Sequence, residues 1–159
     1  MRIEHLVLGP NDWVPNHPSI AVRVYRGLRS ADGHVPDASA FERMFAAHGW
    51  PPDWRGGVYD DHHYHSTAHE VLGVYAGRAR LEIGGPGGDV VTLEAGDALL
   101  LPVGTGHRCV DADAAFRVVG AYPEGQDWDL QRAAPDAATR ARIHALPAPP
   151  RDPVDGAPF

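Results

Sequence analysis

Glycine and proline interrupt this chain so often that few segments are long enough for an ordinary helix. The sequence holds 18 glycines and 15 prolines, which divide it into short apolar runs. Short apolar runs bounded by turn residues are typical of β-strands. The sequence therefore predicts a mainly β fold.

The expected strands are separated by glycine-containing turns. They cover residues 20–25, 57–62, 70–75, 79–83, 90–93, 98–101 and 115–121. Residues 84–88, GGPGG, lie between the runs ARLEI and DVVTL and provide the positive φ angles that a chain reversal needs. We predict a hairpin loop there, because no helix or Gly-Lys-Ser/Thr sequence follows that would indicate a phosphate loop.

Two segments break the β pattern. Residues 39–49, SAFERMFAAHG, carry a capping box of Ser39 and Glu42, apolar residues at helical spacing and a terminal glycine, which together predict a short amphipathic helix. Residues 135–146, PDAATRARIHAL, contain good helix formers and predict a second helix. From Pro147 onward the prolines favour an extended tail, either loose or packed along a neighbour.

Composition excludes several functional classes. With 159 residues, 43% of them hydrophobic and 22% charged, we expect one soluble globular domain. The net charge of −7 and the scattered lysines and arginines argue against nucleic acid as a partner. The apolar run at residues 98–103 is far shorter than the roughly 20 residues of a membrane span. A single cysteine, Cys109, and no signal-like segment lead us to expect a cytoplasmic protein.

The segment HHYHSTAHE, residues 62–70, concentrates four of the ten histidines beside a glutamate. On a strand His63 and His65 point to the same side, so that both imidazoles can reach one metal ion. Glu70 has the wrong parity to join them unless residues 66–68 form a bend or bulge. His69 has the right parity without a bend, and spacing alone leaves both residues open as the next ligand.

A third imidazole has to come from another segment, and His107 is the best placed. It follows the apolar run Ala98–Leu101, Pro102 and a turn with two glycines, which can return a side chain over the mouth of a barrel. Taken alone, His107 fits the cap of a surface turn better than a metal ligand.

The two segments together resemble the signature motifs of the cupin superfamily. The first reads Gly57-x5-His63-x-His65-x4-Glu70-x6-Gly77, and the second reads Gly96-x5-Pro102-x-Gly104-x2-His107-x3-Asp111. The family usually has asparagine at the last position, where Asp111 stands here. The stretches around the first motif and at VVGAYPEGQDWDL also resemble small single-domain bacterial cupins of unsettled activity.

The resemblance implies a cupin-type double-stranded β-helix, a jelly-roll barrel with one or two short helices. It also implies one divalent transition metal (Fe, Mn, Ni or Zn) with four ligands: His63, His65, Glu70 and His107. Within a single structural domain, we expect N-terminal strands and a short helix over 1–56, the cupin core over 57–122, and a C-terminal helix and tail over 123–159.

Residues beside the four ligands suggest further roles. His69 is the candidate catalytic residue, as a base next to Glu70, with a surface histidine as the alternative. His62 alternates with His63 and should point away from the metal. Tyr75, Tyr122 and Trp128 are candidates for an aromatic pocket wall, or else for core or interface positions. The motif Asp127–Asp129, DWD, is left open between a lid, a helix cap and an interface.

Three imidazoles and a carboxylate leave coordination positions for water or substrate on an octahedral metal. The first hypothesis is therefore a metal-dependent enzyme that acts on a small polar metabolite, as an oxidoreductase of dioxygenase type. An isomerase or lyase that uses the metal as a Lewis acid is the second. A non-catalytic small-molecule-binding cupin is the third. We expect a homodimer, paired through exposed strand edges.

Overall fold

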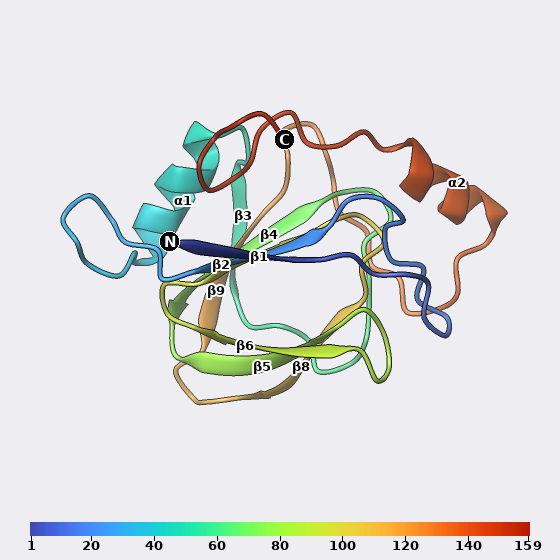
Figure 1. The fold of residues 1–159 in the computed structure, drawn as a ribbon, viewed down its shortest axis with the longest axis horizontal. Helices are drawn as coiled ribbons and strands as arrows, with labels where there is room; N and C mark the ends of the chain where they lie inside the picture. Colours follow the sequence, from blue (N-terminus) through green and yellow to red (C-terminus); the bar gives the residue numbers. More distant parts are fainter.

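The computed structural model describes residues 1–159 as nine strands and two helices (Figure 1). The strands are β1 (Arg2–Leu6), β2 (Val22–Arg26), β3 (Pro52–Gly56), β4 (Glu70–Ala76), β5 (Arg78–Ile83), β6 (Asp89–Glu94), β7 (Ala98–Leu101), β8 (His107–Ala112) and β9 (Arg117–Ala121). The helices are α1 (Ala38–Ala47) and α2 (Ala137–Ala145). This composition confirms the predicted mainly β class.

The strands form two antiparallel sheets that pack against each other. The larger sheet has the order β1-β2-β7-β4-β9-β3, and the smaller has the order β6-β5-β8. Alternate residues of facing strands, such as Leu72 of β4 and Leu81 of β5, are fully buried in one cluster between the sheets. The result is the jelly-roll sandwich that the motifs imply. The GGPGG loop joins β5 to β6, with Ile83 paired to Asp89, which confirms the predicted hairpin.

A second core lies on the outer face of the larger sheet. There α1 buries Phe41 and Phe45 against Val71 of β4 and Leu100 of β7. Figure 1 shows α1 and the C-terminal tail on the side of the larger sheet away from β5, β6 and β8. A Cβ on Gly73 would lie 2.6 Å from the Phe41 ring, so glycine is what lets α1 approach the sheet this closely.

The predicted capping box of α1 is wrong by two residues. Asp37, not Ser39, is the N-cap, and its carboxylate accepts a hydrogen bond from the Ala40 N–H at 2.8 Å. Ser39 lies inside the first turn, and Glu42 pairs with Arg55 of β3 at 2.6 Å instead of with the helix end. Asp136 caps α2 in the same way, accepting a hydrogen bond from the Thr139 N–H at 2.8 Å, so the helix begins at Ala137, two residues after the predicted start at Pro135.

The predicted strand at residues 57–62 is also wrong. These residues are irregular, and the strand lies just before them, where β3 pairs with β9. Proline at position 52 is tolerated because β3 is an edge strand. Strands β1 and β8 were not expected from the sequence either. As a consequence, residues 57–62 run as a loop along the cavity described below.

The proline-rich tail packs on its own chain. The backbone carbonyl of Arg151 accepts a hydrogen bond from Trp50 Nε1 at 2.9 Å. The carbonyl of Pro153 lies 2.8 Å from His48 Nδ1 and pairs with it. Asp152 is buried and accepts hydrogen bonds from Arg23 and Tyr25 of β2. Of the two expectations for the tail, packing along a neighbouring part of the molecule is the one observed.

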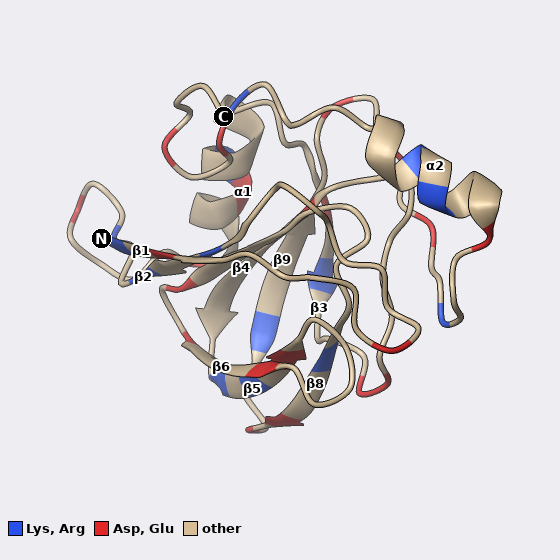
Figure 2. Cartoon of the chain, turned by 45° about the vertical axis from the view of Figure 1, so that its right-hand side comes forward, with Lys and Arg blue, Asp and Glu red and all other residues tan.

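The N-terminal third of the chain belongs to the larger sheet. Residues 1–56 contribute β1, β2 and β3, so they supply half of the larger sheet. Figure 2 shows acidic and basic positions interspersed along the chain. Neither helix combines the length and the apolar character that crossing a membrane requires.

Candidate metal centre

Four side chains meet at one end of the sandwich, two from the first residues of strands and two, His63 and His65, from the segment before β4. His107 is the first residue of β8 and Glu70 is the first residue of β4. His63 is held beside His107 by two backbone hydrogen bonds, His107 N to His63 O at 2.9 Å and His63 N to His107 O at 3.2 Å. This bridge joins the two motif segments, so the structure brings the imidazole of His107 next to that of His63, with ring centroids 4.2 Å apart.

A bend at Ser66–Thr67 allows Glu70 to face the same point as His63 and His65. Asp129 holds this bend, because its carboxylate accepts hydrogen bonds from the Ser66 N–H at 2.6 Å and from the Ser66 hydroxyl. The bend is the interruption that the parity of Glu70 requires. The middle of the DWD motif therefore lies against the site, and its last residue organises the loop between two of the candidate ligands.

The three histidines have the same orientation. Each Nδ1 meets a backbone carbonyl: His63 that of Asp61 at 2.9 Å, His107 that of Thr105 at 3.0 Å, and His65 that of Asp129. A carbonyl only accepts, so each Nδ1 carries the proton and leaves the Nε2 lone pair free. One ring nitrogen from each histidine lies within 4.8 Å of the other two. Such carbonyl contacts are the usual support of metal-binding histidines.

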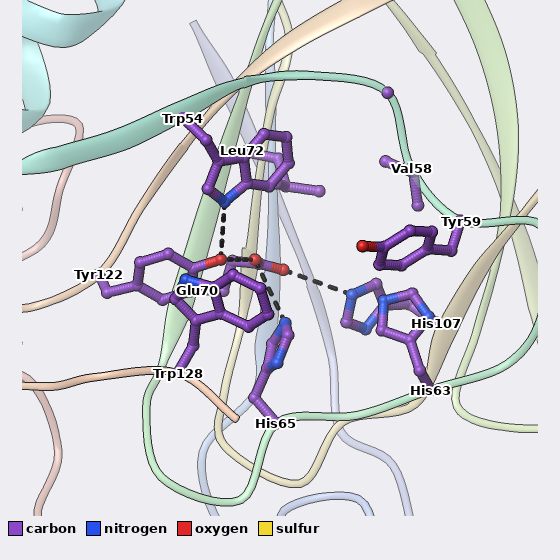
Figure 3. A pocket seen from close by; sticks show the side chains of 11 residues that line it. Trp54, Val58, Tyr59, His63, His65, Glu70, Leu72, His107, Tyr122 and Trp128 are labelled. Atoms are coloured by element: carbon purple, nitrogen blue, oxygen red, sulfur yellow. Dashed lines mark hydrogen bonds and ion pairs between the residues drawn. The ribbon is translucent and has the colours of Figure 1, made fainter. Parts of the chain in front are cut away.

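Glu70 completes the group (Figure 3). Its Oε1 lies 3.3 Å from His107 Nε2, and its Oε2 lies 3.3 Å from His65 Nε2. Oε2 also accepts a hydrogen bond from the Tyr122 hydroxyl, which in turn accepts one from Trp54 Nε1 at 2.9 Å. All four candidate ligands are buried.

The electrostatics of the group follow from this burial. Burial opposes ionisation of Glu70, but the imidazoles of His65 and His107 outweigh it and hold the pKa of Glu70 well below its usual range. Burial also disfavours the charged form of His65, yet Glu70 prevails and raises the pKa of His65. Burial, reinforced by His107, lowers the pKa of His63 to about 3. Glu70 and His63 are thus held in the forms that bind a cation, whereas a cation at this point would take the place of the proton that Glu70 favours on His65.

A cavity of about 300 Å³ opens onto these four residues. Its remaining wall is mainly aromatic, and Figure 3 shows Trp54 on one side and Tyr59 on the other. Tyr122 and Trp128 also line it, with stacked rings whose planes differ by 20°, whereas Tyr75 does not line it. Trp54 and Tyr59 were missed by sequence reasoning. The cluster of aromatic residues just before the first motif is the only signal that points to them.

His69 does not line this cavity. Its Nδ1 accepts a hydrogen bond from the Val103 N–H at 3.0 Å, and its Nε2 meets the carbonyl of Pro147 at 2.8 Å. Both ring nitrogens are therefore engaged with the backbone of neighbouring segments. These contacts favour a structural role for His69, at the junction between the barrel and the tail. They offer no nitrogen to a substrate.

Two other residues beside the ligands also face away from the centre. His62 accepts a hydrogen bond from the Gly85 N–H at 3.0 Å and lies near Glu82, as its alternation with His63 predicts. Cys109 is buried in the core between the sheets. Neither side chain lines the cavity.

Comparisons with known proteins agree with this fold. Residues 54–119 match the Cupin domain family. Over 152 residues the chain is 36% identical to the uncharacterized protein YjlB of Bacillus subtilis strain 168, covering 92% of this chain and 87% of YjlB. The chain belongs to the cupin superfamily, which confirms the resemblance of the two motifs.

Two solved structures show more distant similarity. A DUF861 family protein of Thermotoga maritima is 20% identical, with a TM-score of 0.37 over 55% of this chain and 92% of that protein. A dTDP-6-deoxy-D-glucose-3,5-epimerase of Legionella pneumophila, in complex with dTDP-4-keto-L-rhamnose, is 12% identical, with a TM-score of 0.40 over 92% of this chain and 95% of the epimerase.

Proposed function

We propose that the protein is a metal-dependent enzyme in which His63, His65, Glu70 and His107 hold one divalent transition metal. The observation that carries this proposal is the shared orientation of the three imidazoles, each with Nδ1 on a carbonyl. Their other nitrogens and the buried carboxylate converge on one point beside a cavity. A group of this composition suits iron, manganese, nickel or zinc.

The four proposed ligands would hold the metal, and the cavity would let a substrate reach it. A metal at this point supplies Lewis acidity and, with iron or manganese, the capacity to react with dioxygen. The four ligands come from rigid strand ends and a braced bend, which fixes their positions before a metal or substrate arrives. The cavity gives a small molecule a direct approach to this point.

Within this proposal, oxidoreductase chemistry of dioxygenase type fits the cavity best. An isomerase or lyase usually needs a side chain that takes a proton from substrate. Apart from the four candidate ligands, Tyr59 and Tyr122 are the only titratable residues that line the cavity, and the Tyr122 hydroxyl already donates to Glu70. A dioxygenase reaction, in which the metal reacts with dioxygen, does not need such a proton-accepting side chain in the cavity wall.

Metal content tests the site itself. Protein purified without added metal should contain close to one equivalent of transition metal by elemental analysis. His63→Ala and His107→Ala should each lose most of it, because each removes one ligand of a buried group. His34→Ala is the matched control, since His34 is exposed and remote from the cavity. Equal metal content in all four proteins would overturn the assignment.

Reaction with a dioxygen analogue tests the chemistry. Iron(II)-loaded protein should bind nitric oxide and give the electron paramagnetic resonance signal of a high-spin iron nitrosyl, and it should consume oxygen with a suitable substrate. Turnover of a substrate by zinc- or nickel-loaded protein, without oxygen uptake, would favour the isomerase or lyase instead. Ligand binding without any turnover would favour a non-catalytic cupin.

A further inference from the structure

The cavity offers a substrate very few polar partners. Apart from the four candidate metal ligands, its lining consists of Gly57 and six hydrophobic residues. The six are Trp54, Val58, Tyr59, Leu72, Tyr122 and Trp128. No lysine, arginine, aspartate, serine, threonine, asparagine or glutamine lines it. Apart from the hydroxyls of Tyr59 and Tyr122, the wall therefore contains neither a counter-ion for a phosphate nor the side-chain amide and hydroxyl groups that recognise sugars.

The polar atoms of the aromatic residues are already engaged, with one exception. Trp54 Nε1 donates to Tyr122, and the Tyr122 hydroxyl donates to Glu70. Trp128 Nε1 donates to the Asp53 carboxylate at 2.9 Å. The Tyr59 hydroxyl has no partner within the chain, and Figure 3 shows it on the side of the ring that faces Glu70.

Tyr59 is held in place through its ring and not through its hydroxyl. The ring lies edge-on to His63, with centroids 5.4 Å apart. The guanidinium of Arg132 lies 5.2 Å from the ring centroid and pairs with Asp61. The hydroxyl thus has no partner within the chain at the border of the cavity, where Tyr59 is 54% exposed and its ring contacts His63 and Arg132.

A substrate with polar groups along its whole length would leave most of them unpaired in this cavity. Each unpaired polar group costs free energy that the same group does not pay in water. A flat apolar body instead gains contact with the aromatic faces of Trp128 and Tyr122. At roughly 30 Å³ for each water-sized group, 300 Å³ accommodates about ten non-hydrogen atoms.

We propose that the substrate is a small, flat, largely apolar molecule with its oxygen atoms gathered at one end. The oxygen end faces the histidines and Glu70, the apolar body lies along Trp128 and Tyr122, and the Tyr59 hydroxyl is the one lining side-chain group outside the four ligands that is free to hydrogen-bond it. This inference rests on the proposed metal site. The sequence led us to expect a small polar metabolite, and this inference places its polar groups only at the end that meets the metal.

Three hydroxamates with the same chelating group and different bodies test this class. Benzohydroxamate has an apolar ring, acetohydroxamate has only a methyl group, and serine hydroxamate has a charged, polar body. Their affinities for zinc-loaded protein are measured by titration calorimetry, because zinc excludes redox turnover. Benzohydroxamate should bind at least about tenfold more tightly than acetohydroxamate, since it buries a ring, and serine hydroxamate should bind most weakly.

Two variants locate the effect. Trp128→Ala should remove most of the advantage of benzohydroxamate over acetohydroxamate, because the ring loses a stacking face. Tyr59→Phe should weaken benzohydroxamate binding several-fold, because one hydrogen bond is lost. Both variants should keep the zinc content of the parent protein.

The outcomes separate the two levels of the proposal. If serine hydroxamate binds fully zinc-loaded protein as tightly as benzohydroxamate does, the substrate class is wrong and the metal site stands. If Trp128→Ala leaves the preference for the ring unchanged, the assigned binding face is wrong. A protein that does not take up zinc overturns the metal site and, with it, this inference.

Discussion

Glu70 is the residue on which the chemistry of the site depends most, because each of its oxygens has a different set of partners. Oε1 meets His107 alone, whereas Oε2 meets His65 and the Tyr122 hydroxyl. Burial and the nearby Glu70 carboxylate raise the pKa of Tyr122, so this hydroxyl stays a donor. The donation fixes the carboxylate in its ionised form, which is the form a metal ligand needs.

Tyr122→Phe should therefore weaken metal binding without removing a ligand. We expect about a tenfold loss of zinc affinity, measured by competition with a chromophoric chelator, because supporting partners of ligands contribute on that order. Tyr25→Phe is the matched control, since Tyr25 is also a buried tyrosine that donates to a carboxylate, in this case Asp152. A zinc affinity unchanged in Tyr122→Phe would show that Tyr122 does not support Glu70.

His17 makes the stability of the folded state depend on pH. Burial lowers its pKa to about 4, and its Nδ1 accepts hydrogen bonds from the N–H groups of Ser19 and Ile20 at 3.1 and 2.9 Å. An unfolded histidine titrates near 6.5, so the unfolded chain binds more protons than the folded chain between pH 6.5 and 4. His17 therefore makes the folded state less stable as the pH falls through this window.

His17→Asn keeps a hydrogen-bond acceptor and removes the titration. The unfolding free energy of the parent minus that of the variant should be about 2 kcal/mol lower at pH 5 than at pH 7. Urea unfolding of both proteins at each pH measures this change. His63 titrates in both proteins and cancels in the comparison. A difference that does not vary with pH would rule out the assigned pKa.

Among the larger elements, the bend between His65 and Glu70 determines the geometry of the site. It is held from outside the motif, because Asp129 follows β9 and contacts Ser66 through both carboxylate oxygens. Arg142 of α2 adds a hydrogen bond to the Ser66 hydroxyl at 2.9 Å. The C-terminal segment thus supports the candidate metal centre without providing one of its four proposed ligands.

Asp129→Ala should loosen this bend. We expect a loss of about 2 kcal/mol in unfolding free energy, because the Ser66 N–H and hydroxyl lose their acceptor, together with roughly tenfold weaker zinc binding. Asp127→Ala is the control, since only the backbone carbonyl of Asp127 contacts the bend, through Thr67. Thermal or urea unfolding and zinc competition give both readouts. Zinc binding as tight as in the parent would mean that the bend forms without Asp129.

Local sequence patterns were sufficient to predict some strands and missed others. The hairpin β5–β6 and the interior strands β4 and β7 agree with the pattern, because they are short apolar runs bounded by glycine. The edge strands β1 and β3 were missed, since they carry polar residues and, in β3, a proline. Their pairing partners, β2 and β9, lie well away in the chain and supply what the local sequence lacks.

At the scale of the whole molecule, the tail closes the second core. Val154 is buried with Trp50 and the helix α1, while the Phe159 ring lies 3.9 Å below the Arg23 guanidinium. Asp152 anchors this arrangement through Arg23 at 2.8 Å and through Tyr25. The tail occupies this face of the larger sheet, and β1 is one of the edge strands through which the expected homodimer could pair.

Asp152→Ala should destabilise the fold by about 3 kcal/mol, because it leaves a buried hydroxyl and a partly buried guanidinium without their acceptor. Asp155→Ala, three residues further along the exposed turn, is the control and should change stability little. Urea unfolding at neutral pH measures both. A similar small loss in the two variants would show that the tail is not anchored through Asp152.

The sequence by itself determined the fold class, the hairpin loop and the identity of the four residues that converge. These depend on short-range turn chemistry and on two motifs whose spacing is specific. Spacing left Glu70 and His69 both open, and only the motif resemblance favoured Glu70. The tertiary structure supplies the physical reason, because the bend that turns Glu70 toward the histidines is held by Asp129, far along the chain, while His69 bonds to the Val103 backbone. The tertiary structure alone decided the cavity wall, since Trp54 fits only where Gly120 leaves room, with a Cβ there only 2.2 Å from the indole. Contacts between distant segments have no local pattern in the chain, and for that reason they emerge only when the sheets are packed.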